Sequence, residues 1–572
     1  MTSSSSSSSS SSMGNRIGVL ERISIFFGRK PKPLPIETSF ELPSPLPTWP
    51  EGGGFATGII DLGGLEVCQV STFAKIWSTR QGGPEDMGAT FFEPTSIPDG
   101  FSMLGSYCQP NNKPLSGWIL AARDVTDDCD ALKPPTDYTL VWTSESSRIK
   151  QDGTGYIWLP TPPDGYKAMG LVVTSTPDKP DLETVRCARI EYTDSTENQA
   201  WIWGPGKDVN TDGINVYSLR PKDRGIRAMG VPTGTFVVRN NGDGLGFDIP
   251  CLKNINGSHS SMPDPDQINA LIQAYSPVVY FHRDEQYFPS SVSWFFENGA
   301  LLYKKGEESS PVEILPTGSK LPQGGSNDDE YWIDLPRDEA ARDRVKRGEL
   351  ATAEAYVHVK AMFGGTFTDI AVWIFYPFNG PGKAKVEFID VPLGRIGEHV
   401  GDWEHVTLRI SNFNGEMKSM YLSQHSKGEW VDASEIEFFA ATNKPVAYSA
   451  LHGHPMYRKP GVVMQGSKNV GIRNDSGKGK DSMDIGARFV VVSAEYLAAA
   501  YEEPAWLNYA RKWGPKISYN REEEIRKLEK LLPGRLKGVL ERFVKSLPKE
   551  VLGEEGPVGP KGKDFWYGDE RS

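Results

Sequence analysis

The chain has 572 residues, a formal net charge of −12 at pH 7 and a sequence pI of about 5.4. This acidic balance argues against a protein that binds nucleic acid in bulk, and a hydrophobic content of 38% excludes global disorder. The 59 glycines and 43 prolines favour a mostly-β protein with many turns, and the length allows roughly two to four domains.

The N-terminal region and the cysteines bear on where the protein works. Residues 1–54 are expected to be a flexible Ser-rich arm followed by a Pro-rich linker. The apolar run near the N-terminus is short and carries Glu21 and Arg22, so it predicts no signal peptide. The sequence contains no run of about 18 apolar residues, so no transmembrane helix is predicted. The five cysteines form no CxxC pair, which is typical of a cytoplasmic protein.

A repeat occupies residues 55–255. Three octapeptides align without a gap, namely PDGFSMLG at 98–105, PDGYKAMG at 163–170 and DRGIRAMG at 223–230. Trp77, Trp142 and Trp203 precede the first glycine of these octapeptides by 23, 23 and 22 residues. Each unit consists of short predicted strands joined by Pro, Gly and Asp turns. We predict a threefold β-prism, in which the units close around one axis and the tryptophans meet inside.

One part of this repeat carries a resemblance. The stretch PPDGYKAMGLVVTSTPDKPDLETVRCARI at 162–190 resembles the repeat of β-prism domains in endosomal multivesicular-body adaptors. A similar element occurs in large vacuolar-sorting proteins. These relatives are recruited to membranes, so the resemblance implies a peripheral association with membranes.

The second predicted domain covers residues 265–515. The stretch QINALIQAYSPVVYF at 267–281 indicates a short helix that leads into a strand. Runs rich in Val, Tyr, Phe and Ile predict further strands at 356–364, 368–378, 403–410, 418–426, 435–441, 445–453 and 487–493. Strands of this length and composition are typical of a β-sandwich.

Ionisable residues are concentrated in GEHVGDWEHV at 397–406. Because side chains alternate along a strand, Asp402 and Glu404 share a face with the apolar residues that follow them. Two carboxylates on one buried face repel each other and need a cation or a proton. His399 and the upstream Asp390 complete a candidate metal site with mainly oxygen ligands, which favours a divalent cation such as calcium or magnesium.

The alternative to a metal site is an ordinary strand end. In that interpretation Arg395 or Lys385 supplies the positive charge, and the carboxylates have a structural role. The protein would then be a scaffold for protein interactions, and removal of a metal would change nothing but stability.

Three other histidines are weaker candidates for chemistry. His452 and His454 are two residues apart and so share one strand face, where they could bind zinc or transfer protons. Glu404 could form an acid/base pair with His425 or His452, as a metal-dependent hydrolase would require. We expect these histidines to be structural and the protein to work without turnover, with the hydrolase as an open alternative.

The C-terminal segment, residues 516–572, differs from the rest of the chain. It contains an apolar stripe at helical spacing with Arg and Lys opposite, divided by Pro533 and Gly534. An amphipathic basic helix of this kind either lies on a membrane or packs against its own domain.

Residues 353–459 resemble the necrosis-inducing cytolysins of plant-associated microbes. HVGDWEHV at 399–406 corresponds to their HRHDWEN heptad, and SQHS and YSALHGHPMY follow it in matching order. The resemblance implies metal ligands at His399, Asp402 and Glu404, while Asp390 lies one residue out of register. It also implies binding of membrane sphingolipids and damage to the bilayer without turnover. The chain departs from the family where Val400-Gly401 replaces Arg-His.

A broader resemblance runs from about residue 31 to residue 570. PLPIETSFELPSPLPTWPEGGGFATGIIDLGGLEVCQVSTFAKIW, YSPVVYFHRDEQYFPSSV and GEHVGDWEHV together look like the plant branch of the vacuolar protein sorting-associated protein 62 family. This resemblance implies membrane traffic, with a location at endosomes or the vacuole.

These observations lead to one functional hypothesis. We expect a non-enzymatic, peripheral membrane-binding protein that recognises lipid head groups or glycans and does not bind nucleic acid. Its role is either vacuolar and endosomal sorting or defence through pore-forming membrane damage. The second role would require self-association on membranes.

Overall fold

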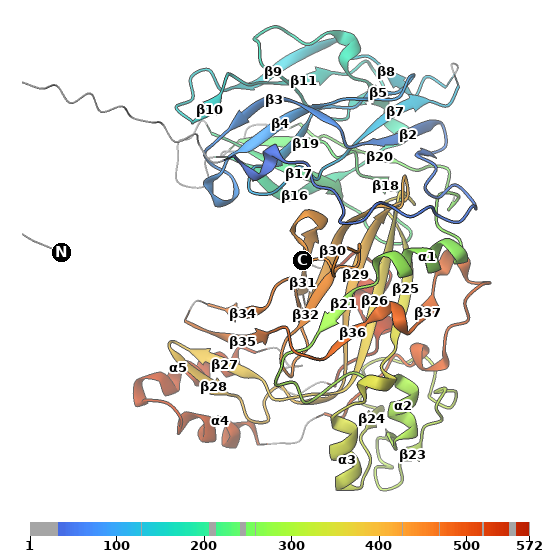
Figure 1. Ribbon diagram of the computed structural model, residues 1–572, viewed down its shortest axis with the longest axis vertical. Coiled ribbons are helices and arrows are strands. Elements are labelled where there is room, and N and C mark those ends of the chain that lie inside the picture. Colours follow the sequence, from blue (N-terminus) through green and yellow to red (C-terminus); the bar gives the residue numbers. More distant parts are fainter. Residues whose placement is uncertain are drawn as a thin grey trace, which may run out of the picture.

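The computed structural model describes residues 33–126, 129–204, 213–240, 247–257, 259–425, 427–467, 469–516, 520–547 and 556–570. The predicted serine arm falls on residues 1–32, outside these ranges. Two β-rich domains are stacked on each other, with the repeat domain above the second domain in Figure 1. Within the described residues no helix has the length and apolar character needed to cross a bilayer.

The first domain is the predicted β-prism. Its strands are β1 Ile59–Asp61, β2 Leu65–Val70, β3 Phe73–Thr79, β4 Ala89–Pro94, β5 Ser102–Met103, β6 Tyr107–Pro110, β7 Ile119–Asp124, β8 Leu132–Lys133, β9 Asp137–Thr143, β10 Gln151–Asp152, β11 Tyr156–Thr161, β12 Tyr166–Ala168, β13 Val172–Thr174, β14 Cys187–Arg189, β15 Thr193–Asp194, β16 Thr196–Trp203, β17 Ile214–Pro221, β18 Gly230–Val231, β19 Phe236–Asn240 and β20 Cys251–Lys253. Each repeat contributes two small sheets, and β10 of the second repeat joins the sheet β10-β3-β4-β6 of the first. This exchange links the repeats around the axis.

The three repeated tryptophans meet inside the prism, as the sequence predicts. The ring centroids of Trp77 and Trp142 lie 5.8 Å apart, and both rings lie 5.7 Å from the ring of Trp203. Apolar residues of all three repeats surround them. A unit of short strands buries its inner face only against the other two units, which explains why the tryptophan recurs once in each.

The repeated glycines have two different structural reasons. Gly100 and Gly165 have φ of +83°, and Gly225 has φ of +131°, in a backbone region that side chains rarely adopt. The second glycines leave no space for a side chain, because a Cβ would meet backbone atoms at Gly105 and Gly170 and the ring of Pro221 at Gly230. A Cβ on Gly105 would lie 2.8 Å from the Cα of Gly170, so the first two repeats touch here without space for a side chain.

We expect Gly105→Ala to lower the free energy of unfolding by about 1–3 kcal/mol, the usual range for overpacking. The added methyl group would meet backbone atoms of Gly170, which cannot rotate away. Urea denaturation followed by tryptophan fluorescence measures the change. Gly538→Ala is the matched control, because that helical glycine has open space around its Cβ position. Equal stability of the two variants would contradict the packing argument.

The second domain is a β-sandwich with additional small sheets. Its strands are β21 Val278–Tyr280, β22 Leu301–Lys304, β23 Val312–Glu313, β24 Tyr331–Asp334, β25 Ala355–Met362, β26 Phe367–Asn379, β27 Lys383–Val386, β28 Ile389–Pro392, β29 His399–Ser411, β30 Met417–Gln424, β31 Lys427–Asp432, β32 Val446–Ser449, β33 Met456–Tyr457, β34 Gly461–Gly466, β35 Val470–Ser476, β36 Ser482–Asp484 and β37 Phe489–Ser493. The sheet β31-β30-β29-β26-β25-β37 faces the sheet β33-β32-β21-β36 across the main core. Helix α1 (Pro265–Tyr275) packs on this core, and α2 (Val292–Glu297) and α3 (Glu339–Lys346) lie at the far end from the prism (Figure 1).

Two predicted segments behave differently from the expectation. Residues 435–441, predicted as a strand, form only a single bridge between Phe438 and Pro445. The Pro-rich segment was expected to be a linker, but it packs on the second domain. Phe40 stacks on Phe438, and Trp49 packs against the second-domain core. These contacts hold residues 33–54 against the body of the protein.

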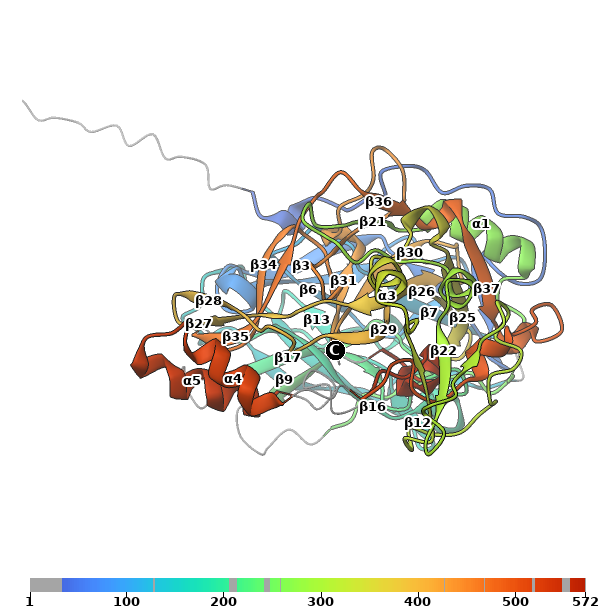
Figure 2. The same cartoon turned by 90° about the horizontal axis from the view of Figure 1, so that it is seen from below.

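The C-terminal helices pack against their own domain. Helices α4 (Arg521–Glu529) and α5 (Gly534–Lys545) bury their apolar stripe on strands β27, β28 and β35 at the edge of the molecule, seen in Figure 2. The chain then returns to the body, so that the described C-terminal end lies close to the prism in Figure 1. Of the two predicted roles of this apolar stripe, the structure therefore shows packing against its own domain and not binding to a membrane surface.

Strand β29 shows the predicted alternation, with one difference. Asp402 and Glu404 point to the same side as the apolar core residues of this strand, opposite Tyr376 and Ile374 of β26. The opposite face is not exposed, however. It is buried as well, because residues 556–570 and the aromatic cluster around Trp403 cover it.

Candidate functional site

A cavity of about 250 Å³ opens where strand β29 begins. It lies between this strand, the β27–β28 hairpin, strand β35 and the loop at 451–453. Its lining includes Asn379, Lys383, Leu393, Ile396, His399, Asp402, Trp403, Glu404, His425, Leu451, His452, Ile472, Arg473, Asn474, Asp475, Pro557 and Lys563. Three of the four predicted metal ligands and two of the weaker candidates therefore share one cavity.

The charge of Asp402 is balanced by a histidine. The Nδ1 of His454 lies 2.9 Å from a carboxylate oxygen of Asp402, and its Nε2 lies 3.0 Å from the carbonyl oxygen of Tyr287. Both oxygens can accept a hydrogen bond, and the two ring nitrogens of His454 are placed to meet them. Burial would raise the pKa of Asp402, but the hydrogen bond from His454 and the charge of His399 hold it below the ordinary value.

The partner of Asp402 is not one of the cations that lie near it in the sequence. Arg395 and Lys385 are nearby in the sequence, whereas His454 is 52 residues away from Asp402. His454 is fully buried, and an unpaired buried carboxylate is strongly unfavourable. The one available signal was the spacing of His452 and His454, which placed them on a strand without indicating a carboxylate partner.

Each of the remaining candidates has a hydrogen-bond partner in the structure. Glu404 accepts a hydrogen bond from the Ser423 hydroxyl, and the Nδ1 of His399 lies 3.1 Å from the carbonyl oxygen of Gly401. His425 Nε2 lies 3.2 Å from the side-chain oxygen of Asn474. The hydroxyl of Ser423 is thus one partner of Glu404 in this structure.

The backbone of the cavity is strained at its histidines. His425, His452 and His454 all have positive φ, between +58° and +66°. Such a conformation costs a residue with a side chain about 1–2 kcal/mol, and strained residues are concentrated at binding sites because the surrounding structure has to hold them. For His452, a carboxylate oxygen of Glu285 accepts the backbone N–H at 2.7 Å.

Several buried polar atoms around the cavity have no hydrogen-bond partner among the residues that the structure describes. They are the Nε2 of His452, the side-chain nitrogen of Asn474 and the indole nitrogen of Trp403. Burial lowers the pKa of His452, so its ring is neutral and can donate or accept. Unsatisfied groups of this kind are costly unless a ligand or water completes them.

Asp390 does not belong to this cluster. Its carboxylate forms an ion pair with Arg473 on the partly exposed side of strand β28, and it does not line the cavity. The pairing of β27 with β28 and β35 carries it to Arg473. In the described part of the chain, no three His, Cys, Asp or Glu side chains converge closely enough to hold a metal. Asp402 contacts His454 through one carboxylate oxygen, so a cation would have to bind its other oxygen or displace the histidine.

Fold and site define a class of protein: a β-prism joined to a β-sandwich that carries a small cavity lined by polar and apolar residues. The chain belongs to the family described as vacuolar protein sorting-associated protein 62, which matches residues 36–570. The assignment to a plant branch of this family stays a prediction.

Two relatives come from Saccharomyces cerevisiae. TDA6, named for vacuolar protein sorting, is 25% identical over 244 residues, which cover 36% of this chain and 50% of TDA6. Vacuolar protein sorting-associated protein 62 is 25% identical over 284 residues, which cover 42% of this chain and 58% of that protein. The matches thus span only about half the length of these relatives.

Solved structures show more distant likenesses. Necrosis and Ethylene inducing Protein 2 from the causal agent of cocoa's Witches Broom disease is 13% identical with a TM-score of 0.18, covering 34% of this chain and 68% of that one. NLPPya in complex with glucosamine is 16% identical with a TM-score of 0.19, covering 34% and 70%. At these scores the likeness carries no conclusion about function.

Proposed function

We propose that the protein binds the sugar-bearing head group of a membrane lipid in the cavity at the start of β29, without turnover, and that it works in vacuolar or endosomal sorting. The cavity carries this proposal. Its volume of about 250 Å³ lies just below the range of small-molecule sites, roughly 300–1,000 Å³, so it accepts one small ring rather than a polymer.

The chemistry of the lining supports a ligand rich in hydroxyl groups. Hydroxyls both donate and accept, and they meet carboxylate acceptors at Asp402 and Glu404 and an unpaired amide donor at Asn474. Leu393 and Ile472 offer an apolar wall for the C–H face of a ring. The family name supports a role in sorting.

Asn474→Ala is expected to weaken head-group binding roughly tenfold, because one buried hydrogen bond contributes about 1–1.5 kcal/mol. Binding is measured by cosedimentation with liposomes that contain inositol or glycosyl head groups, against plain phosphatidylcholine. Asn198→Ala is the matched control, since it removes the same amide from an exposed position on the prism. Equal binding to all liposomes, or equal loss in both variants, would overturn the proposal.

The same liposomes distinguish sorting from membrane damage. Loaded with a self-quenching dye, they should bind the protein and retain the dye if it is a sorting adaptor. Dye release that requires Asp402 would move the function to pore formation. Hydrolysis products from the lipid head group, lost in Glu404→Gln, would favour the hydrolase instead.

A divalent cation remains part of the proposal. Calcium or magnesium would replace His454 as the positive partner of Asp402, with His399 and Glu404 as further ligands. At a hundredfold excess over its Kd, such an ion should raise the free energy of unfolding by about 2.7 kcal/mol, and Glu404→Gln should remove the rise. Thermal melts with calcium, magnesium and EDTA check this, and identical melts in all three would exclude the ion.

A further inference from the structure

One face of the six-stranded sheet combines aromatic and charged residues in place of the apolar residues of the other face. Strands β25, β26 and β29 place its residues in three rows across the sheet. The rows are Tyr356–Trp373–His405, His358–Ala371–Thr407 and Lys360–Asp369–Arg409. The C-terminal segment 564–570, with the sequence DFWYGDE, lies on this face.

The aromatic half of the segment stacks on the sheet. The ring of Trp566 lies 3.8 Å from the ring of His358 at an interplanar angle of 14°. The ring of Phe565 lies 4.9 Å from that of His405 and nearly parallel to the ring of Trp373. Stacked rings of this kind contribute beyond the area they bury.

The acidic half of the segment accepts hydrogen bonds from buried donors on the sheet. Glu570 accepts from the Lys360 ammonium at 3.1 Å, from His405 Nε2 at 3.0 Å and from the Thr407 hydroxyl at 2.6 Å. The two other hydrogen bonds of Lys360 go to the carbonyl oxygens of Phe565 and Gly568. All three ammonium donors of a lysine that is 1% exposed are therefore directed at this segment.

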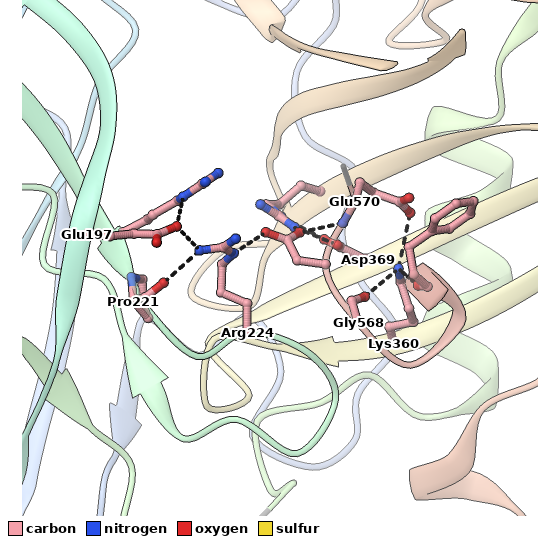
Figure 3. A network of polar contacts seen from close by, with 11 residues as sticks. Glu197, Pro221, Arg224, Lys360, Asp369, Gly568 and Glu570 are labelled. Atoms are coloured by element: carbon pink, nitrogen blue, oxygen red, sulfur yellow. Dashed lines mark hydrogen bonds and ion pairs between the residues drawn. The ribbon is translucent and has the colours of Figure 1, made fainter. Parts of the chain in front are cut away.

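Asp569 joins the two domains. It lies 2.6 Å from Arg409 of the second domain and 3.0 Å from Arg224 of the prism. Arg224 in turn bonds Glu197 of β16, so charges alternate from the prism across the segment to the sheet. Figure 3 shows Arg224 and Lys360 on the two sides of the segment.

The segment is held through side chains and single hydrogen bonds, not through a strand ladder. In the described residues its neighbourhood contains only one isolated bridge, between Lys512 and Val558. The fit also leaves polar atoms unsatisfied. Among the described residues, the Nδ1 of His358 lacks a hydrogen bond, and its Nε2 lies 3.6 Å from a carboxylate oxygen of Glu495. The indole nitrogens of Trp373 and Trp566 have no hydrogen-bond partner there either. Unsatisfied buried polar atoms of this kind lower the stability with which segment 564–570 is bound to the sheet.

A second cavity, of about 960 Å³, opens beside the acidic half of the segment. The wall that does not belong to the segment is strongly basic. It carries Arg220, Lys222, Arg224, Arg227 and Lys427, with Asp223 as its one acid. The segment contributes three acids, Asp564, Asp569 and Glu570. The surroundings therefore match an acidic peptide and leave room for it to enter.

From these observations we infer that this sheet face is a peptide-binding groove, which the chain's own segment 564–570 occupies. Its ligand class is a peptide with two adjacent aromatic residues followed, after two residues, by two adjacent carboxylates. A partner protein that carries such a segment displaces residues 564–570. Because Asp569 connects Arg409 to Arg224, displacement also breaks the ion pairs between the segment and the prism.

The test uses the full chain with a protease site introduced into residues 548–555. After folding and cleavage, the fragment that contains 556–570 is held by its contacts alone. A fluorescent synthetic peptide of residues 556–572 should exchange into the cut protein and saturate it, as measured by anisotropy. A peptide with Asp569→Asn and Glu570→Gln should bind at least tenfold more weakly, and added salt should weaken the parent peptide.

A second test uses a full-length variant without cleavage, so that the proposal can still be tested if the cleaved protein unfolds. Full-length Asp569→Asn/Glu570→Gln weakens the internal occupant, so it should bind the fluorescent peptide at least tenfold more tightly than the uncut wild type. Equal binding of parent and substituted peptides would overturn the proposal. So would the absence of peptide binding to both the cut protein and this variant, because the segment would then be a fixed part of the fold.

Discussion

Arg409→Met is expected to lower the free energy of unfolding by about 3–5 kcal/mol, the usual cost of removing one partner of a buried ion pair. Arg409 donates two hydrogen bonds to the fully buried Asp369 and one to Asp569. Methionine keeps much of the side-chain volume against Phe363 and Trp430. It leaves Asp369 without its guanidinium, whereas Asp569 keeps Arg224. Denaturation in guanidinium chloride, followed by circular dichroism, measures the loss.

The pH dependence of this variant identifies the cause. Burial raises the pKa of Asp369, and without Arg409 this carboxyl has to take up a proton. A raised folded-state pKa gives stability below the unfolded value of about 3.9 that is lost as pH rises. The defect of the variant should therefore shrink toward pH 4. The double variant Arg409→Met/Asp369→Leu should recover stability, because an apolar pair can replace a buried ion pair. A defect that is independent of pH would point to lost packing.

Asp402→Ala is expected to cost about 3 kcal/mol, at the lower end of the same range. The substitution leaves the buried His454 ring without its carboxylate partner, while Nε2 keeps its contact with the carbonyl oxygen of Tyr287. Asp402→Asn is the matched control. Its amide can donate to Nδ1 of a neutral imidazole, so it should cost clearly less. Thermal and urea unfolding of both variants measure the difference.

The wild type gives the complementary pH test. The folded-state pKa of Asp402 is depressed, so its contribution is present above the unfolded value of about 3.9 and is lost as pH falls through the folded value. The gap between wild type and Asp402→Ala should be constant near neutrality and close only below about pH 4. A gap that closes between pH 5 and 7 would indicate that another group titrates.

Local sequence patterns predicted the prism well, because each repeat contains residues that need a particular environment. A tryptophan in each unit needs an interior, and the glycines at 105 and 170 need backbone contact. The same holds for β29, where a period of two placed Asp402 and Glu404 on the core side. The apolar stripe of the C-terminal helices was equally readable, since amphipathic spacing survives whichever surface covers it.

Only part of the candidate site could be predicted from the sequence. The density of ionisable residues at 397–406 indicated a site, and His399, Asp402 and Glu404 do share one cavity. Asp390 was placed there by its nearness in the sequence, but strand pairing carries it to Arg473. Asn474 and Lys563 carried no signal at all, because each comes from an element whose position depends on the sheets around it.

The sequence by itself determined which faces are apolar, where the repeats lie and that carboxylates are concentrated at the start of β29. The tertiary structure alone decided which charges meet. Lys360 and Glu570 are 210 residues apart, and His454 reaches Asp402 over 52. The physical reason is that periodicity reports the local environment a side chain needs, whereas a buried charge is satisfied by whichever partner the fold brings within hydrogen-bond distance.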